Sequence, residues 1–162
     1  MRYSFAQHIW LSITEMDIHH LDLKNERLVL EALAIHCTCP IEWGAEPDLQ
    51  TNCVAENLAK LEARFPKTIL YVQDHGRIIA LHWLEVPIRR HGYIRSLWID
   101  PAYRRGGLAT ALKLTGEQWF ADQGVQTIET EVSEQNPPMR ALNDRLGYVA
   151  KGDKFIKQLT SA

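Results

Sequence analysis

The stretch from Tyr93 to Phe120 is the feature that most constrains the fold of this chain. Residues 93–99 are rich in β-branched and aromatic side chains, which is typical of a strand. Asp100 and Pro101 end that strand, because proline supplies no backbone N–H to a sheet. Apolar residues then recur at helical spacing. They are Leu108, Ala111, Leu112 and Trp119. The sequence therefore predicts a strand, a glycine turn and a helix in direct succession.

The turn between this strand and this helix has the composition of a phosphate-binding loop. It reads Arg104-Arg105-Gly106-Gly107. The first N–H groups of a helix have no partner inside the helix, and its dipole stabilises an anion there by about 0.3–1 kcal/mol. An ordinary strand-to-helix turn is the alternative interpretation. Neither a G-x-x-x-x-G-K-[S/T] string nor a G-x-G-x-x-G string occurs, so the two common nucleotide-binding loops are excluded.

Length and composition predict a single globular domain. The chain has 162 residues, 46% of them hydrophobic, and a net charge of −2, which argues against general nucleic-acid binding. No apolar run has the length of a membrane span, and Arg2, Gln7 and His8 interrupt any signal-peptide core. The charge is uneven: residues 1–66 hold five Lys/Arg against ten Asp/Glu, whereas residues 67–162 hold thirteen against ten.

The three cysteines are an odd number, which predicts reduced thiols in a cytoplasmic protein. His36, Cys37 and Cys39 lie close together, but nothing else in the chain has metal-ligand spacing. We therefore expect free thiols and no metal.

Further elements follow from periodicity and turn residues. The first half is expected to hold a strand at 8–13, a helix from Thr14 or Asp17 to Ile35 with a break near 24–25 left open, and a helix at 52–64. Antiparallel strands are expected at 68–72, 77–86 and 93–99. After the helix that follows the glycine turn come a strand at 126–133, a short helix after Asn136, and a closing hairpin of residues 148–151 and 154–159. The Asn136 side chain is expected to form an Asx turn or an N-cap before the proline pair.

This loop and this order of elements resemble the GNAT superfamily of N-acetyltransferases. The family fingerprint is Arg/Gln-x-x-Gly-x-Gly/Ala after a strand, and a second motif near the C-terminus has the form Asn-x-x-Ala/Met-x-x-x-Tyr/Asn-x-x-x-Gly-Phe/Tyr. The resemblance covers residues 68–159 well and the first 66 in outline. The matching positions are Arg104, Gly107 and Ala109 in the first motif, and Asn136, Met139, Asn143, Gly147 and Tyr148 in the second.

The resemblance implies an α/β (α+β) fold. Its central sheet is mixed and mostly antiparallel, with six to seven strands, about four flanking helices and a splay between the two central parallel strands. Residues 1–162 would form one acyl-CoA N-acyltransferase domain. Within it, residues 1–66 would supply the helices on the acceptor side, and residues 67–162 would form the CoA-binding core.

The resemblance also implies transfer of an acetyl group from acetyl-CoA to a primary amine by direct attack. The acceptor would be a small molecule or a peptide, and the acidic first 66 residues favour a cationic one. The Leu97 N–H would polarise the thioester carbonyl. The resemblance also allows a homodimer. The expected CoA contacts are Leu97, Trp98, Ile99, Arg104, Arg105, Gly106, Gly107, Leu108, Ala109, Thr110, Asn136 and Asn143.

Two positions depart from the family pattern. Asn143 stands where many members have the tyrosine that protonates the leaving thiolate, and an amide can only donate a hydrogen bond to the sulfur. Tyr93 stands where some members carry a catalytic glutamate. The general base is therefore open, and the candidates are Glu85, Glu129, Glu131, His82 and Asp100. A CoA-binding module that has lost its chemistry is the rival hypothesis.

Overall fold

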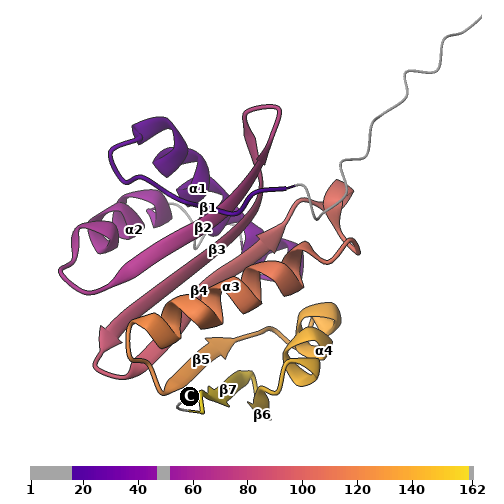
Figure 1. Ribbon diagram of the computed structural model, residues 1–162. Helices are drawn as coiled ribbons and strands as arrows, with labels where there is room; N and C mark the ends of the chain where they lie inside the picture. The colour runs from indigo at the N-terminus through magenta and orange to yellow at the C-terminus, as the bar shows by residue number, and fades with distance from the viewer. Residues whose placement is uncertain (1–15, 47–51, 161–162) are drawn as a thin grey trace, which may run out of the picture.

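The computed structural model describes residues 16–46 and 52–160, which form a seven-stranded mixed sheet in the order β1-β2-β3-β4-β5-β7-β6 (Figure 1). The expected strand at 8–13 lies outside the described residues. Every neighbouring pair is antiparallel except β4 and β5, which are parallel. The strands are β1 (His19–His20), β2 (Lys67–Asp74), β3 (Arg77–Ile88), β4 (His91–Ile99), β5 (Thr127–Glu131), β6 (Val149–Lys151) and β7 (Lys154–Gln158).

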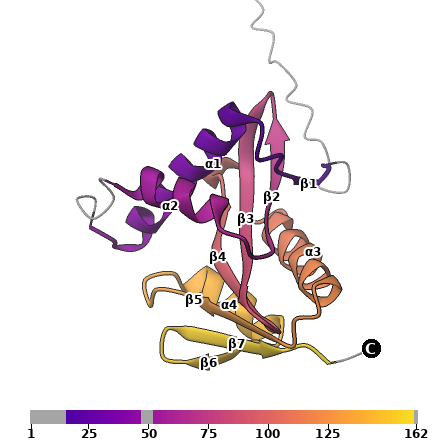
Figure 2. The ribbon, with the colours of Figure 1, turned by 90° about the vertical axis from the view of Figure 1, so that its left-hand side faces the viewer.

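Helices cover both faces of the sheet. Figure 2 shows α1 and α2 on one face of the central strands and α3 on the other. The α-helices are α1 (Glu26–Thr38), α2 (Cys53–Glu62), α3 (Leu108–Asp122) and α4 (Pro137–Arg145), with two short 3-10 helices, η2 (Cys39–Trp43) and η4 (Pro101–Tyr103). The prediction of a mixed sheet of six to seven strands with about four helices is confirmed, with seven strands and four α-helices among the described residues.

The first helix begins later than the sequence predicted. Residues His19–His20 pair with β2 as an edge strand, and α1 starts only at Glu26. The Asn25 side chain accepts a hydrogen bond of 3.2 Å from the Leu28 N–H, which caps the helix. The expected helix is thus wrong over residues 17–25, and α1 begins directly after positions 24–25, where the sequence left a break open.

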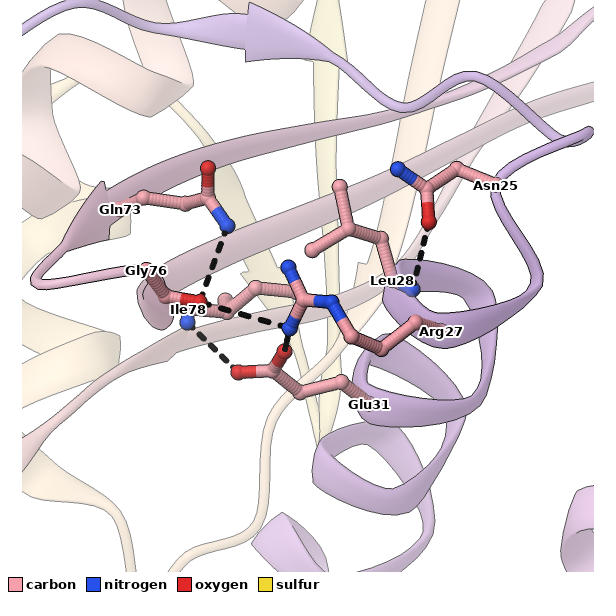
Figure 3. Close-up of polar contacts among 7 residues, drawn as sticks. All are labelled: Asn25, Arg27, Leu28, Glu31, Gln73, Gly76 and Ile78. Carbon is pink, nitrogen blue, oxygen red and sulfur yellow. Dashed lines mark hydrogen bonds and ion pairs between the residues drawn. The ribbon is translucent and has the colours of Figure 1, made fainter.

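A partly exposed polar contact fixes α1 against the β2–β3 hairpin (Figure 3). Glu31 accepts a hydrogen bond of 2.6 Å from the Ile78 N–H and pairs with Arg27 at 3.0 Å. Arg27 in turn donates to the Gly76 carbonyl at 3.4 Å. The hairpin turn therefore stays attached to the helix on this face of the sheet.

The central strands are buried on both faces, so the hydrophobic core has two parts. Leu81 and Trp83 of β3 pack toward α1, whereas Ala80 and Leu84 pack toward α3. This alternation matches the predicted period of two. Ile79 departs from the pattern and packs on the α3 side, because a bulge opposite residues 72–73 shifts the register there.

The two parallel strands separate part-way along their length. β5 pairs only with residues 91–94 of β4, and within the described residues no strand pairs with that edge of β4 beyond Ile94. A shift in the β3–β4 register falls at the same point, between the pairs Trp83–Ser96 and Leu84–Ile94. The predicted splay between the central parallel strands is therefore present, and it leaves the backbone edge of residues 95–99 free of a neighbouring strand.

A disulfide joins Cys37 at the end of α1 to Cys53 at the start of α2, with the two Cα atoms 5.8 Å apart. The expectation of three reduced thiols is therefore wrong for these two residues. The number of cysteines does not reveal which of them form a disulfide, because a disulfide requires a Cα separation that only the tertiary structure sets. Cys39 is the free cysteine among the described residues, and burial raises the pKa of its thiol to about 12.

We expect this disulfide to stabilise the α1–α2 pair by constraining the unfolded chain. The bonded residues are 16 apart, and a loop of that size contributes about 3 kcal/mol. Cys53→Ala should lower the thermal midpoint by roughly 6–12 °C, at about 2–4 °C per kcal/mol for a chain of this size. Cys39→Ser is the matched control and should leave the midpoint nearly unchanged. Equal midpoints for Cys53→Ala and the parent protein would contradict the expectation.

No helix within residues 16–46 or 52–160 combines the length and apolar character needed to cross a membrane. Over the same residues, no group of three or more metal-ligating side chains gathers at one point.

Candidate active site

In the loop before α3, no side chain caps the first-turn N–H groups of the helix. η4 follows β4 directly, and the Asp100 side chain caps it by accepting from the Ala102 N–H at 2.9 Å. Arg105 and Gly107 then take left-handed backbone angles, with φ of 64° and 91°. A Cβ built on Gly107 would meet no atom within 4 Å, so the space beside the α3 N-terminus is empty of protein. This cradle has the room and the polarity that a phosphate needs.

Arg104 is bound to the protein itself. Its guanidinium makes a two-pronged ion pair with Glu42 of η2, with the second contact at 2.8 Å, and its Nε donates to the Ile99 carbonyl at 2.9 Å. The Trp43 ring lies 5.8 Å from the guanidinium carbon. Arg104 therefore fastens the loop to β4 and η2, and Arg105 is the arginine of the pair that is exposed.

A first cavity, here called the loop cavity, has a volume of about 510 Å³ and lies between the loop and α4. Arg145 of α4 reaches across its rim and donates to the Thr110 hydroxyl at 3.2 Å. Figure 1 shows α4 beside the N-terminal end of α3. Of the twelve residues expected to contact CoA, those lining this cavity are Leu97, Trp98, Ile99, Arg104, Arg105, Gly107, Leu108, Ala109, Thr110 and Asn136.

A second cavity, here called the splay cavity, has a volume of about 400 Å³ and lies where β4 and β5 separate. Asn143 lines it, whereas Gly106 lines neither cavity. The residues from the first 66 that line the splay cavity carry no charge. Glu42 is the nearby acidic residue, but it is paired with Arg104 and does not line the cavity. The two cavities share Trp43, Leu97, Trp98, Asn136 and Met139.

The two asparagines of the second motif lie along the same cavity. Asn136 caps α4, with its side-chain oxygen accepting from the Met139 N–H at 3.2 Å, as its predicted role as an N-cap requires. Asn143 is two turns further along, fully buried, and lines the splay cavity with Asn136. The helix therefore places both amides toward the splay, as their spacing of seven residues predicts.

The Asn143 amide has an unexpected partner. Lys113 of α3 is 1% exposed, and its Nζ donates to the Asn143 Oδ1 at 2.5 Å. The Asn143 Nδ2 is buried and has no hydrogen-bond partner among the described residues. Lys113, Trp43 and Arg145 were not predicted from the sequence as residues of the site. The signal for Lys113 was a charged residue on an apolar helix face, directly after Leu112.

The candidate bases are separated by their positions. Glu131 lines the splay cavity, and the other four candidates line neither cavity. Burial raises the pKa of Glu85, which lies 3.8 Å from Arg95, and a hydrogen bond from Lys154 lowers the pKa of Glu129.

The two remaining candidates are also engaged elsewhere. Burial lowers the pKa of His82 to about 3, and its ring nitrogen bonds the Ser96 carbonyl at 3.1 Å. Asp100 caps η4 and pairs with Arg77 at 3.2 Å. Of the five candidates, Glu131 is therefore the one that lines a cavity of this site.

Comparison with known sequences identifies the family. The sequence profile of the acetyltransferase (GNAT) family matches residues 30–148, and the chain belongs to that family. A mycothiol acetyltransferase of Salinispora tropica is 33% identical over 85 residues, which are 49% of this chain and 28% of that protein. The chain thus matches just over a quarter of the length of the curated relatives found. The predicted family membership is confirmed.

Solved structures with this fold include two acetyltransferases bound to coenzyme A. The PaiA N-acetyltransferase of Thermoplasma acidophilum has a TM-score of 0.68 at 14% identity, over 89% of this chain and 99% of that one. An aminoglycoside 6'-N-acetyltransferase also has a TM-score of 0.68, at 15% identity, over 91% of this chain and 99% of that one. At this identity the likeness establishes the fold, and function has to be argued from the site.

Proposed function

We propose that this protein is an N-acetyltransferase that moves the acetyl group of acetyl-CoA to a primary amine by direct attack. The main support for the proposal is that the loop cavity and the splay cavity adjoin each other. The open left-handed loop at the α3 N-terminus lines the loop cavity, and the splay cavity shares five lining residues with it. An extended ligand with a phosphate end and a thioester end fits this arrangement.

Different residues of this chain would bind the successive parts of acetyl-CoA along the two cavities. N–H groups of residues 105–109 hold the pyrophosphate, with Arg105 and Arg145 at hand for further phosphate contacts. The free edge of residues 97–99 pairs with the pantetheine arm as a short added strand, with Asn136 beside it. Acetyl-CoA supplies the activated acyl group, and the Leu97 N–H polarises its carbonyl.

Proton transfer is the second task of the site. The attacking amine must be neutral, and among the candidate bases Glu131 is the one placed to take its proton, directly or through water. Asn143 would donate a hydrogen bond to the sulfur as the thiolate leaves. The direct experiment is release of the free thiol from acetyl-CoA across a panel of amines, polyamines, aminoglycosides and peptides. Binding of CoA without turnover of any amine would favour the rival, a CoA-binding module.

The acceptor is proposed to be a small-molecule or peptide amine that enters from the splay cavity. The curated relative named above is a mycothiol acetyltransferase, and one structural relative is an aminoglycoside acetyltransferase. Residues 39–40 and 43–45 line the splay cavity, which supports an acceptor-side role for the first 66 residues within a single domain. Dependence on acetyl-CoA, a metabolite of the cytoplasm, supports a cytoplasmic location. A homodimer stays a prediction.

We expect the acidic half of the chain to attract a cationic acceptor over distance. The value of kcat/KM for a cationic amine should then fall steeply between 0.01 M and 0.15 M salt, since the screening length shrinks from about 30 Å to about 8 Å. A neutral-chain amine of the same length is the control and should respond weakly. The same slope for both amines would show that the charge asymmetry plays no part in acceptor binding.

A further inference from the structure

Lys113 is a lysine in the hydrophobic core with one strong partner. It lies on the buried face of α3 with Leu108, Leu112 and Phe120, and is 1% exposed. Lysine is almost never fully buried without a specific role for its amine or a partner for its charge. Here the Nζ donates to the Asn143 Oδ1 at 2.5 Å and lies 3.8 Å from the centre of the Tyr148 ring. Both Lys113 and Asn143 line the splay cavity.

No carboxylate bonds the Lys113 ammonium in the described structure. Glu117, one turn further along α3, is paired with Lys157 of β7 at 2.7 Å. His82 of β3 faces the same region and is neutral, because burial and, to a lesser extent, the charge of Lys113 lower its pKa to about 3. Burial also lowers the pKa of Lys113, to about 7, with Glu117 raising it and Lys157 lowering it. The Tyr148 hydroxyl stays protonated, since burial raises its pKa.

The lysine decides which way the Asn143 amide faces. An ammonium group has hydrogen-bond donors and no acceptor, so it can meet only the carbonyl oxygen of the amide. The Nδ2 must then point away from Lys113, and this nitrogen is buried without a partner among the described residues. A buried amide N–H is costly to leave unsatisfied. The arrangement thus holds an N–H donor ready for an acceptor that enters the splay cavity.

We propose that Lys113 is a positioning residue that turns the Asn143 N–H toward the sulfur of the leaving thiolate and adds its own positive field there. The inference rests on the proposed acetyl transfer. In that reaction the amine nitrogen bonds the acetyl carbon, the C–S bond breaks, and its electron pair passes to sulfur. The amine loses its proton to the base or to water, and the thiolate takes one from water on release. Lys113 and Asn143 keep their protons throughout and stabilise the negative sulfur.

The test that does not depend on turnover is the thiol pKa of CoA bound to the protein, followed by the ultraviolet absorbance of the thiolate. An opposite charge and a donated hydrogen bond lower a pKa by about one to three units. We expect the bound thiol to titrate that much higher in Lys113→Met than in the parent protein. Lys113→Gln, whose side chain is one atom shorter and keeps an N–H donor but no charge, should lie between them. Lys154→Met removes an exposed cation of β7 and should leave the thiol pKa unchanged.

A thiol pKa that is the same in the parent, Lys113→Met and Lys113→Gln would overturn the proposal. Calorimetry with CoA keeps this outcome separate from failure of the proposed function. If CoA does not bind the parent protein, the acetyltransferase proposal fails. If CoA binds all variants with one thiol pKa, only the role of Lys113 fails.

Kinetics then separate action through Asn143 from a direct effect. Lys113→Met should lower kcat roughly 10-fold or more with little change in the KM for acetyl-CoA, and should lower it much less in an Asn143→Ala background. In the parent, kcat should lose a component above about pH 7 as Lys113 loses its proton, and Lys113→Met should lack that component. Effects that multiply in the double variant would exclude the positioning role.

Discussion

Gly107→Glu should abolish binding of acetyl-CoA. The substitution places a carboxylate in the cradle proposed for the pyrophosphate, where repulsion between like charges costs several kcal/mol. At about 1.4 kcal/mol per factor of ten, we expect affinity to fall roughly 100-fold or more. Gly107 also has a φ of 91°, and a residue with a side chain in this left-handed region costs about 1–2 kcal/mol of stability. Calorimetry with acetyl-CoA measures the first effect, and thermal unfolding measures the second.

A second glycine provides the matched control for this variant. Gly124 follows the other end of α3, has a φ of 72°, and like Gly107 has no atom within 4 Å of a built Cβ. Gly124→Glu therefore carries a similar backbone strain and the same added charge away from the loop. It should lose a similar amount of stability and keep its affinity for acetyl-CoA. If Gly107→Glu also keeps its affinity while folded, the phosphate-loop assignment is wrong.

Removing the Asn143 side chain should slow the chemical step. A hydrogen bond to a developing thiolate contributes about 1–3 kcal/mol, so Asn143→Ala should lower kcat roughly 5- to 150-fold. Because Asn143 is proposed to act on the leaving sulfur, the affinity for acetyl-CoA should change little. Single-turnover kinetics with an acceptor found in the amine panel would measure the effect. An unchanged kcat would mean that Asn143 only packs.

Two further substitutions separate the donor from the packing. Asn143→Asp keeps the shape and can still accept from Lys113, but it offers no N–H and brings a negative charge toward the sulfur. We expect it to lose at least as much kcat as Asn143→Ala while remaining folded. Asn143→Tyr would supply the phenol that many family members have, but Asn143 is fully buried against Lys113. The larger ring should therefore cost about 1–3 kcal/mol of stability by overpacking.

Much of the fold could be predicted because the local signals agree with the tertiary structure. Residues 67–160 show alternating strands, turn residues and caps at the expected places, and the cap at Asn136 forms as predicted. The first half was harder to predict. The short strand His19–His20 forms because its backbone pairs with Tyr71 and Leu70 of β2. Two adjacent histidines give no sequence signal for a strand or for this pairing.

The candidate site divides in the same way. Spacing alone placed Gly107 at a helix N-terminus and Asn136 and Asn143 along one cavity, because the rise and turn of a helix fix relations between residues close in sequence. Arg104 was predicted to be available to phosphate, but Glu42, 62 residues away, holds it. Glu131 lines the splay cavity and Glu129 does not, although the two lie on one strand two residues apart.

By itself the sequence determined the order of the strands and α-helices from residue 67 onward, the glycine loop and the family, since these depend on short-range pattern. Tertiary structure alone decided the contacts between residues far apart. It joined Cys37 to Cys53, placed Lys113 of α3 against Asn143 of α4, and ended the pairing of β4 with β5 at Ile94. Each of these depends on distances set when helices pack on the sheet. The role proposed for Lys113 depends on a hydrogen bond to Asn143, 30 residues away, and no local sequence pattern predicts that contact.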